Sequence, residues 1–165
     1  GNSLWLVGET REEMGGGEWY RLHGWLGMLS PTPDIREAPK VLAAMHAEAA
    51  DFTNTFRAMA DLAADDNALP GSFLAWTHRW RARLAREPGG VASCIATMQR
   101  TNPAYVPRNH RVEECIDAAV QDGNFGPFHA LHDVLARPYQ AQRDRDSYRT
   151  PPLPHERVQN TFCGT

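Results

Sequence analysis

The sequence has few cysteines, a single lysine and no long apolar run, and each of these scarcities excludes a class of protein. Three cysteines in 165 residues are too few, and too odd in number, for the disulfide framework of a small secreted domain. No stretch approaches the roughly 18 to 20 consecutive apolar residues that a membrane-spanning helix needs. The first residues lack the basic region and apolar run of a signal peptide. We therefore expect a cytoplasmic protein with no membrane partner.

Lysine is almost absent, since Lys40 is the only one among 17 basic residues. The formal net charge is -3, so no net basic field exists to gather phosphates, and nucleic-acid binding is not expected. The glycine-rich stretch 8–17 cannot be a Walker loop, because no Gly-Lys-Ser/Thr follows it. It is either a backbone cradle for a phosphate or, as the pattern alone favours, a mobile glycine-rich loop.

Beyond Lys40, apolar residues recur at helical spacing and predict a mainly α protein. The stripes are Phe52, Phe56, Met59 and Ala63; Phe73, Trp76, Trp80 and Leu84; Val91, Cys94, Ile95 and Met98; Val112, Cys115, Ile116, Ala119 and Val120; and Phe128, Leu131, Val134 and Leu135. Asp34 and Asp51 are placed as N-caps, and Gly123 as a left-handed C-cap. We expect a core of five to six helices.

The two ends of the chain differ from this helical middle. Residues 4–7, Leu-Trp-Leu-Val, are typical of one short buried strand. From Tyr139 onward the chain is polar and rich in proline, which favours an extended tail. We therefore predict an appended α/β fragment at 1–40, a helical domain at 41–138 and an extended tail at 139–165.

Two constellations could carry binding chemistry. His129 and His132 stand three apart on a helix, but zinc needs three or four ligands and no third is suitably spaced, so ordinary half-buried histidines are favoured. The helix with Arg79, Arg81, Arg83 and Arg86 could bind an acidic partner, although a solvated face explains it as well. Its tryptophans are interpreted as core anchors and not as a platform for bases.

The cysteines fall into two kinds. Cys94 and Cys115 lie on apolar stripes, where a free thiol behaves as a small buried hydrophobe. Cys163 is the third residue from the end, in a polar tail where a thiol would be accessible for exchange. From chemistry alone it is either a redox or cross-linking residue or an idle terminal thiol.

The segment from Met98 to Gln142 contains N-P-x-Y-V-x-R-N, a helix, G-N-F, a second helix and R-P-Y, and the chain ends T-F-C-G-T. These motifs resemble the C-terminal part of the selenoprotein O family of protein adenylyltransferases. The stretches DFTNTFRAMADL (51–62) and FLAWTHRWRARLA (73–85) are similar to its helical region. The resemblance runs from about 41 to 165, and Cys163 occupies the place that selenocysteine holds in other members.

The resemblance implies a helical C-terminal subdomain of a kinase-like (pseudokinase) fold, in an enzyme that transfers AMP from ATP to Ser, Thr or Tyr of proteins with magnesium. None of that family's nucleotide, metal or catalytic residues can be matched here, so we expect no catalytic residue and no bound cofactor in this chain, and no activity alone. The resemblance implies a redox role for Cys163, whose disulfide partner would lie in the missing kinase-like core. An alternative is a non-enzymatic helical module that docks on such a core through its helices and Cys163.

Residues 1–40 are similar instead to a segment of the large phosphoribosylformylglycinamidine synthase of purine synthesis, through GNSLWLVGETREEMGGGEWYRLHG. A purine-biosynthesis fragment is therefore a third alternative, and a join of two families near 40–50 is a hypothesis. Helices that evolved against a missing core should expose an apolar face. We expect that face to be built from the Phe52–Met59 or the Trp76–Trp80 stripe.

Overall fold

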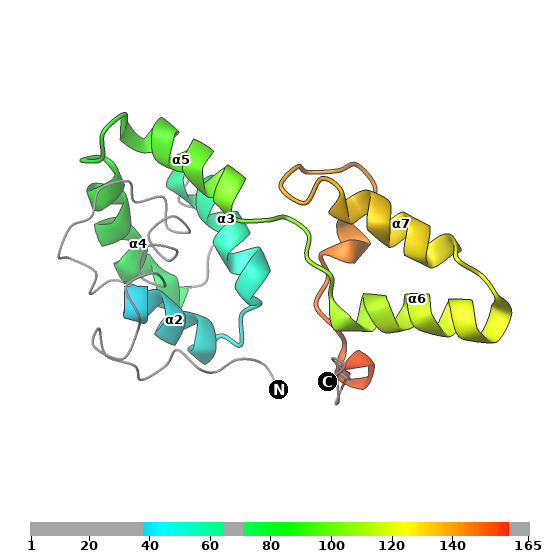
Figure 1. Cartoon of the computed structure of the whole chain (residues 1–165). Coiled ribbons are helices and arrows are strands. Elements are labelled where there is room, and N and C mark those ends of the chain that lie inside the picture. Colours follow the sequence, from blue (N-terminus) through cyan, green and yellow to red (C-terminus); the bar gives the residue numbers. More distant parts are fainter. Residues whose placement is uncertain (1–37, 65–70, 159–165) are drawn as a thin grey trace, which may run out of the picture. The chain divides into compact units, whose positions relative to one another are not determined.

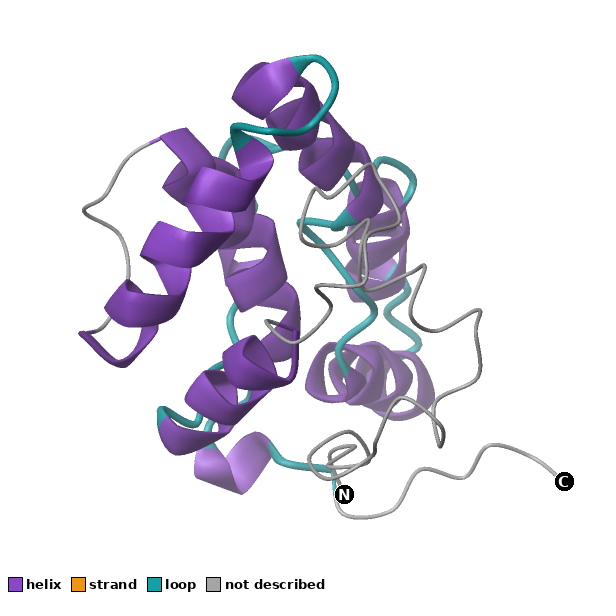
Figure 2. Cartoon of the chain, turned by 90° about the vertical axis from the view of Figure 1, so that its left-hand side faces the viewer, coloured by secondary structure: helices purple, strands orange, loops and turns teal. Residues whose placement is uncertain are grey.

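The computed structural model describes residues 38–64 and 71–158, and within them the regular structure is entirely helical (Figures 1 and 2). The mainly α prediction is thus confirmed for this part of the chain. The predicted strand at 4–7, the glycine-rich stretch and the Asp34 cap lie outside the described residues. None of the described helices is long and apolar enough to cross a membrane.

The chain divides into two compact units between Asn102 and Pro103. This division falls inside the range 41–138 that the helical pattern groups as one domain. The pattern has no means of showing it, because helical periodicity reports which face of each helix is buried and not which helices share a core.

The first unit contains four helices: α2 (Ala38–Ala47), α3 (Phe52–Ala64), α4 (Gly71–Leu84) and α5 (Gly90–Thr101). Helix α3 packs against α5 along its length, and α4 contacts both α2 and α5. The predicted stripes form one core, whose largest fully buried side chains are Trp80, Met59, Leu62, Leu84, Met98, Val41 and Cys94. Trp76 and Trp80 stack with ring centroids 5.3 Å apart, as core anchors.

The turn between α2 and α3 shows how local chemistry sets the helix ends. The Asp51 carboxylate accepts the backbone N–H of Asn54 at 2.9 Å, which is the predicted N-cap of α3. Just before it, Ala49 adopts a left-handed conformation with φ of 49° while the Ala50 N–H bonds back to Met45. Glycine usually occupies such a position, so alanine holds the turn under strain.

Asn102 is the last residue of the first unit and the first residue of the Asn-Pro motif. Its side chain is fully buried, and its amide group donates to the Phe56 carbonyl at 2.8 Å. The Arg57 guanidinium in turn donates to the carbonyls of Gln99 and Asn102 at 2.8 and 3.0 Å. These bonds fasten the end of α5 to α3, so the first residues of the family-like motif belong to the structural core.

The second unit contains α6 (Asn109–Asp122), α7 (Gly126–Leu135) and the short 3-10 turns η2 (Asp146–Tyr148) and η3 (Pro154–Glu156). Helices α6 and α7 form a hairpin. Gly123 ends α6 in the left-handed conformation, with φ of 61°, and confirms the predicted C-cap. The Asn124 side chain then accepts the Gly126 N–H at 2.9 Å and directs the chain into α7.

The buried cluster of the second unit is small. Ala104, Tyr105 and Val134 are fully buried, with Leu135 and Tyr148 packed against them. A unit of this size removes little apolar surface from water, so its polar contacts contribute a large share of its stability. The predicted tail from 139 does follow an irregular path, but Tyr148 and the turn η2 pack it onto this cluster.

Candidate functional site

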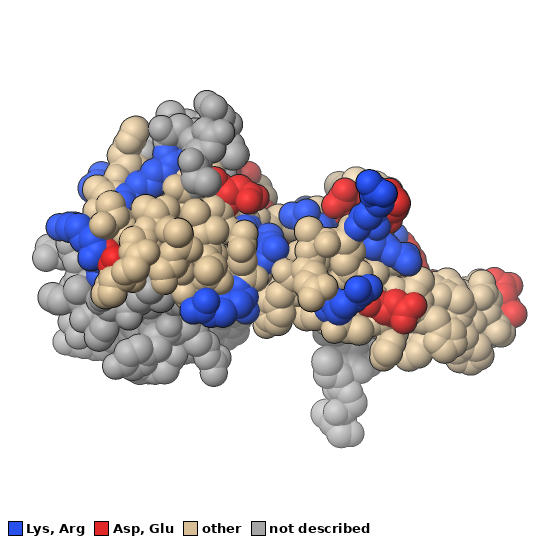
Figure 3. All heavy atoms as spheres, turned by 90° about the horizontal axis from the view of Figure 1, so that it is seen from above, with Lys and Arg blue, Asp and Glu red and all other residues tan. Residues whose placement is uncertain are grey.

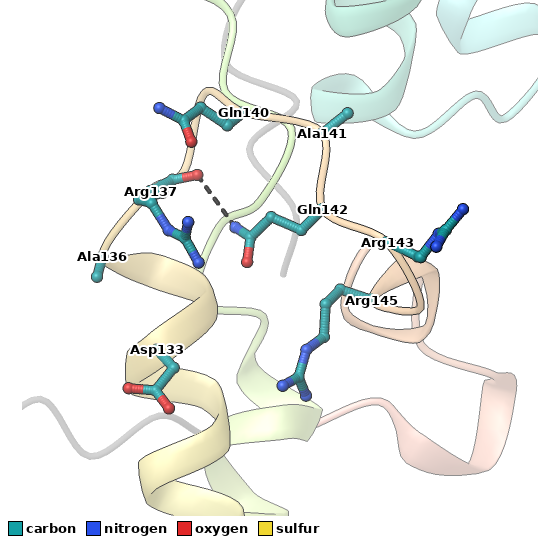
Figure 4. Close-up of a pocket in the computed structure, with 8 residues that line it drawn as sticks. All are labelled: Asp133, Ala136, Arg137, Gln140, Ala141, Gln142, Arg143 and Arg145. Carbon is teal, nitrogen blue, oxygen red and sulfur yellow. Dashed lines mark hydrogen bonds between the residues drawn. The ribbon is translucent and has the colours of Figure 1, made fainter.

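A hollow with a volume of about 530 Å³ lies between the end of α7 and the loop that follows it (Figure 4). Arg137 and Arg145 point into the space between helix and loop, and Arg143 lies at the rim with its side chain turned outward. The lining residues are Asp133, Ala136, Arg137, Gln140, Ala141, Gln142, Arg143 and Arg145. A polar concavity with three guanidinium groups is a candidate site for an anion.

The loop that carries these arginines is held by backbone hydrogen bonds. The Pro138 carbonyl accepts the N–H groups of Ala104 and Tyr105 at 2.7 and 3.1 Å. The Tyr105 hydroxyl bonds to both backbone groups of Gln142, at 3.1 Å from its nitrogen and 3.3 Å from its oxygen. The side chains of the hollow therefore start from a fixed backbone.

Gln142 also changes the electrostatics of the hollow. Its amide nitrogen donates to the carbonyls of Val134 and Arg137 at 2.9 and 3.1 Å. The Val134 carbonyl belongs to the last turn of α7, where the helix dipole is negative, and the Arg137 carbonyl lies just beyond the end of the helix. Because the amide occupies them, they repel an incoming anion less than open carbonyls would.

A second polar feature lies at the start of α6. His110 is 5% exposed, and neither ring nitrogen has a hydrogen-bond partner among the described residues. Burial lowers the pKa of His110, and the neighbouring Arg111 and Arg108 lower it further, while Glu156 and Glu114 act in the opposite direction. A buried imidazole without partners is held neutral at the expense of stability.

The hairpin carries an exposed apolar surface near the turn between its helices. We call it the hairpin face, and it comprises Ile116, Val120, Phe125 and Phe128, which are 48%, 78%, 58% and 50% exposed. Viewed from above, the turn end of the hairpin is mostly uncharged, with acidic side chains at its tip (Figure 3). Apolar surface gathered in this way is typical of a contact with another protein segment.

The expected location of the exposed apolar face is therefore wrong. Phe56, Met59, Trp76 and Trp80 are all at most 3% exposed and lie in the core of the first unit. The hairpin face exposes apolar side chains instead, because the small second unit offers too few partners to cover them. Of the residues in the two predicted stripes, Phe52 is exposed, with 42% of its surface accessible.

The predicted histidine pair gains no further ligand. His129 and His132 are both exposed, not half-buried, and contact the ring of Phe128 at centroid distances of 5.5 and 6.3 Å. Over residues 38–64 and 71–158, no three His, Cys, Asp or Glu side chains converge as metal ligands. The structure therefore does not bring these histidines into a metal site.

Two of the three cysteines lie within the described residues. Cys94 and Cys115 are free and buried, as predicted, and burial raises the pKa of both thiols, with smaller contributions from Glu87 and Glu114. Both are poor nucleophiles for that reason. Cys163 lies outside the described residues, so its redox role stays a prediction.

The arginine-rich helix α4 is only partly a solvated face. The Arg81 guanidinium donates to the Leu62 carbonyl, with its Nε at 2.7 Å. Arg83 pairs with the buried carboxylate of Glu87 at 2.6 Å. Arg79 and Arg86 are exposed. Two of the four predicted cations thus stabilise the first unit.

Neither the arginines of the hollow nor the burial of His110 follows from a pattern in the sequence. The spacing of Arg137, Arg143 and Arg145 has no helical or strand period, so only their density within nine residues was a signal. His110 is the second residue of α6, and its neighbours Arg108 and Arg111 are charged, so the local sequence predicts an exposed side chain. Its burial depends on how the tail folds back, which local patterns do not report.

Comparison with known proteins gives one consistent answer. A protein of Rhizobium etli (strain CIAT 652) is 46% identical over 165 residues, covering 90% of this chain and 33% of its own length. One of Rhodopseudomonas palustris (strain BisB18) is 42% identical over 168 residues, covering 96% of this chain and 34% of its own. Both are named protein nucleotidyltransferase YdiU. No family model matches.

These matches bear on the first forty residues. An alignment that covers 96% of the chain leaves too few residues outside it to omit that segment. The resemblance of residues 1–40 to the purine-synthesis enzyme therefore gains no support, and neither does a join of two families. The chain spans about a third of the length of these curated relatives.

Proposed function

The chain belongs to the selenoprotein O-type family of protein nucleotidyltransferases, and from that premise we propose that it is the helical C-terminal part of a protein adenylyltransferase. The reaction is the transfer of AMP from ATP, with magnesium, to hydroxyl groups of Ser, Thr or Tyr on proteins. The observation that carries the proposal is the 46% identity over 90% of this chain to a named nucleotidyltransferase.

In this proposal the chain supplies structure and not the reacting groups. The residues with which the family binds nucleotide and metal have no counterpart in this sequence, and the relatives extend over about three times the matched length. A kinase-like core in the remainder of the protein would hold ATP and magnesium. The 165 residues alone are then inactive.

A second candidate function is an interaction module without catalysis, and the hairpin face favours it. Ile116, Val120, Phe125 and Phe128 expose apolar side chains that a covering segment would remove from water. In the first proposal this segment belongs to the same protein, and in the second to a separate kinase-like protein. The hairpin face supports docking in both.

Cys163 completes the proposal as a redox residue that forms a disulfide with a cysteine of the core. Cys94 and Cys115 do not serve, because both thiols are buried and have raised pKa values. Co-purification of the chain with the core under non-reducing conditions tests the disulfide. A gel band that dithiothreitol removes and that Cys163→Ser abolishes supports it, whereas equal recovery of the core with Cys163→Ser contradicts it.

The catalytic proposal is tested by label transfer from α-labelled ATP with magnesium. The chain alone should label no protein. A chimera in which this chain replaces the homologous third of the Rhizobium etli relative should label itself or added protein. Label transferred by the isolated chain contradicts the division of roles, and a folded chimera that stays inactive contradicts the family function.

A further inference from the structure

Three arginines lie at the hollow beside α7. Arg137, Arg143 and Arg145 make no side-chain hydrogen bond and no ion pair with any described residue, although Arg145 lies 6.0 Å from the centre of the Tyr148 ring. Elsewhere in the same unit, Arg111 pairs with Glu114 at 2.7 Å and Arg149 with Asp146 at 3.6 Å. The guanidinium groups without such a pair are thus gathered at this hollow.

Neighbouring acids do not neutralise this charge. Asp133 lines the hollow, but its nearest cationic partner is His132 at 3.8 Å, and its side chain is 75% exposed. Asp144 lies between Arg143 and Arg145 and is exposed, in a left-handed conformation with φ of 60°. Three cations and two nearby carboxylates leave an excess of positive charge at a concave surface, where field lines concentrate.

We propose that this hollow binds an oligophosphate group, such as pyrophosphate or the polyphosphate of a nucleotide, through Arg137, Arg143 and Arg145. Arginine presents a planar fork of donors that matches phosphate oxygens in pairs. Gln140 lines the same hollow and adds an amide donor, whereas the amide of Gln142 is already bonded to the Val134 and Arg137 carbonyls. Several donors on one short loop suit a ligand with several adjacent oxyanions better than a single carboxylate. The proposal does not depend on the adenylyltransferase function.

The composition of the hollow also predicts what it does not select. None of the described residues that line it is aromatic, so a nucleotide base has no ring on which to stack. ATP and GTP should therefore bind equally well, and tripolyphosphate should bind at least as tightly as either. Selectivity for one base would place the ligand elsewhere in the chain.

The fixed loop makes the site ready for its ligand. The bonds of Pro138 with Ala104 and Tyr105, and those of Gln142 with Tyr105, hold the loop in place before a ligand arrives. Only the arginine side chains need to be ordered on binding, at about 0.5–1.5 kcal/mol for each. Binding should be sensitive to salt, because the hollow is open to solvent.

Calorimetric titration of the 165-residue chain at low salt, without magnesium, tests the proposal. The probes are tripolyphosphate, pyrophosphate, ATP, GTP and orthophosphate, with poly-glutamate as the acidic-peptide comparator. We expect one site per chain, tripolyphosphate binding at least tenfold more tightly than orthophosphate, and at least tenfold weaker binding in Arg143→Gln/Arg145→Gln. The matched control is Arg86→Gln, which removes an exposed arginine from the other unit and should change nothing.

Three outcomes overturn the proposal. They are absence of binding, affinity that the double variant leaves unchanged, and poly-glutamate binding as tightly as tripolyphosphate, which would make the hollow a contact for acidic proteins. If the double variant fails to fold by circular dichroism, Arg143→Gln alone decides, since its side chain lies at the rim and makes no hydrogen bond or ion pair with a described residue. A weakening of about threefold or more then supports the site, and an unchanged affinity contradicts it.

Discussion

The hydroxyl oxygen of Tyr105 bonds to both backbone groups of Gln142, 37 residues further along the chain. It accepts the Gln142 N–H at 3.1 Å and donates to the Gln142 carbonyl at 3.3 Å. Tyr105 belongs to the Asn-Pro-Ala-Tyr segment of the family-like motif, and Gln142 belongs to the loop of the hollow. One buried phenol thus joins the most specific sequence motif to the candidate anion site.

Removal of that hydroxyl should loosen the loop. Tyr105→Phe keeps the buried ring but leaves two backbone groups without their partner, which should cost about 1–2 kcal/mol. Hydrogen exchange in peptides from 103–158 measures the change without interference from the first unit. Tyr139→Phe is the control, since Tyr139 is 46% exposed and its ring can remain hydrated. Equal exchange in the two variants would contradict the role of Tyr105.

The strained turn after α2 predicts a stabilising substitution. Ala49 has φ of 49°, so Ala49→Gly should raise the free energy of unfolding of the first unit by roughly 0.5 kcal/mol, net of the extra freedom of glycine in the unfolded chain. Ala43→Gly, at an exposed position inside α2, should lower it by about 1 kcal/mol. Urea unfolding followed by tryptophan fluorescence reports this unit, because all five tryptophans precede residue 103. If both substitutions changed the free energy of unfolding in the same direction, strain at Ala49 would be contradicted.

His110 predicts that the second unit weakens in mild acid. Burial and the adjacent arginines lower its pKa in the folded state, so the unfolded chain binds the proton more readily. The contribution of neutral His110 is fully present above the unfolded pKa of 6.5 and is lost as the pH falls below it. Glu156 acts in a lower window, since its pKa is also lowered, chiefly by the Leu153 N–H bond, and its contribution disappears below about 4.5.

Calorimetric melting of the chain between pH 7.5 and 5.5 measures this effect. The melting temperature of the second unit should fall with pH, and His110→Leu should flatten the fall. His132→Leu is the control, because His132 is 70% exposed. A pH dependence that is identical in wild type and His110→Leu would assign the effect to other groups.

The hairpin face predicts a surface that binds an apolar probe. Replacing Val120 and Phe128 by serine should reduce the fluorescence of bound anilinonaphthalene sulfonate while changing the free energy of unfolding by about 0.5 kcal/mol or less, because both side chains are already largely exposed. The same double variant should bind the remaining two thirds of the Rhizobium etli relative less well. Phe52→Ser, which replaces a half-exposed phenylalanine of the first unit, is the control. It should leave the fluorescence of the bound dye and the binding of the relative's remaining part unchanged.

Much of the helical architecture can be predicted from this sequence, because the stripes through Met59, Trp80 and Met98 are strictly periodic and each lies in the core. Caps follow equally local rules, as Asp51 and Gly123 show. The division between Asn102 and Pro103 cannot be predicted in this way. It depends on which stripes meet, and the stripes of α3 and α6 look alike in sequence although one is buried and the other is partly exposed.

The sequence predicts less of the candidate site than of the fold. Arg137, Arg143 and Arg145 line one hollow because Tyr105 and Pro138 hold an irregular loop, and such a path follows from long-range bonds and not from a local period. The same holds for His110, which is buried although it sits in a polar segment. By contrast, the motifs that identify the family are contiguous, and comparison with relatives confirmed them.

Transfer of labelled AMP tests the central claim most directly. The chain, incubated with α-labelled ATP and magnesium, should incorporate no label, and the chimera that joins it to the remaining two thirds of the Rhizobium etli relative should incorporate label that depends on magnesium. Labelling by the isolated chain, or a folded chimera that binds ATP but transfers no AMP, would contradict the claim that this chain is the helical part of a protein adenylyltransferase.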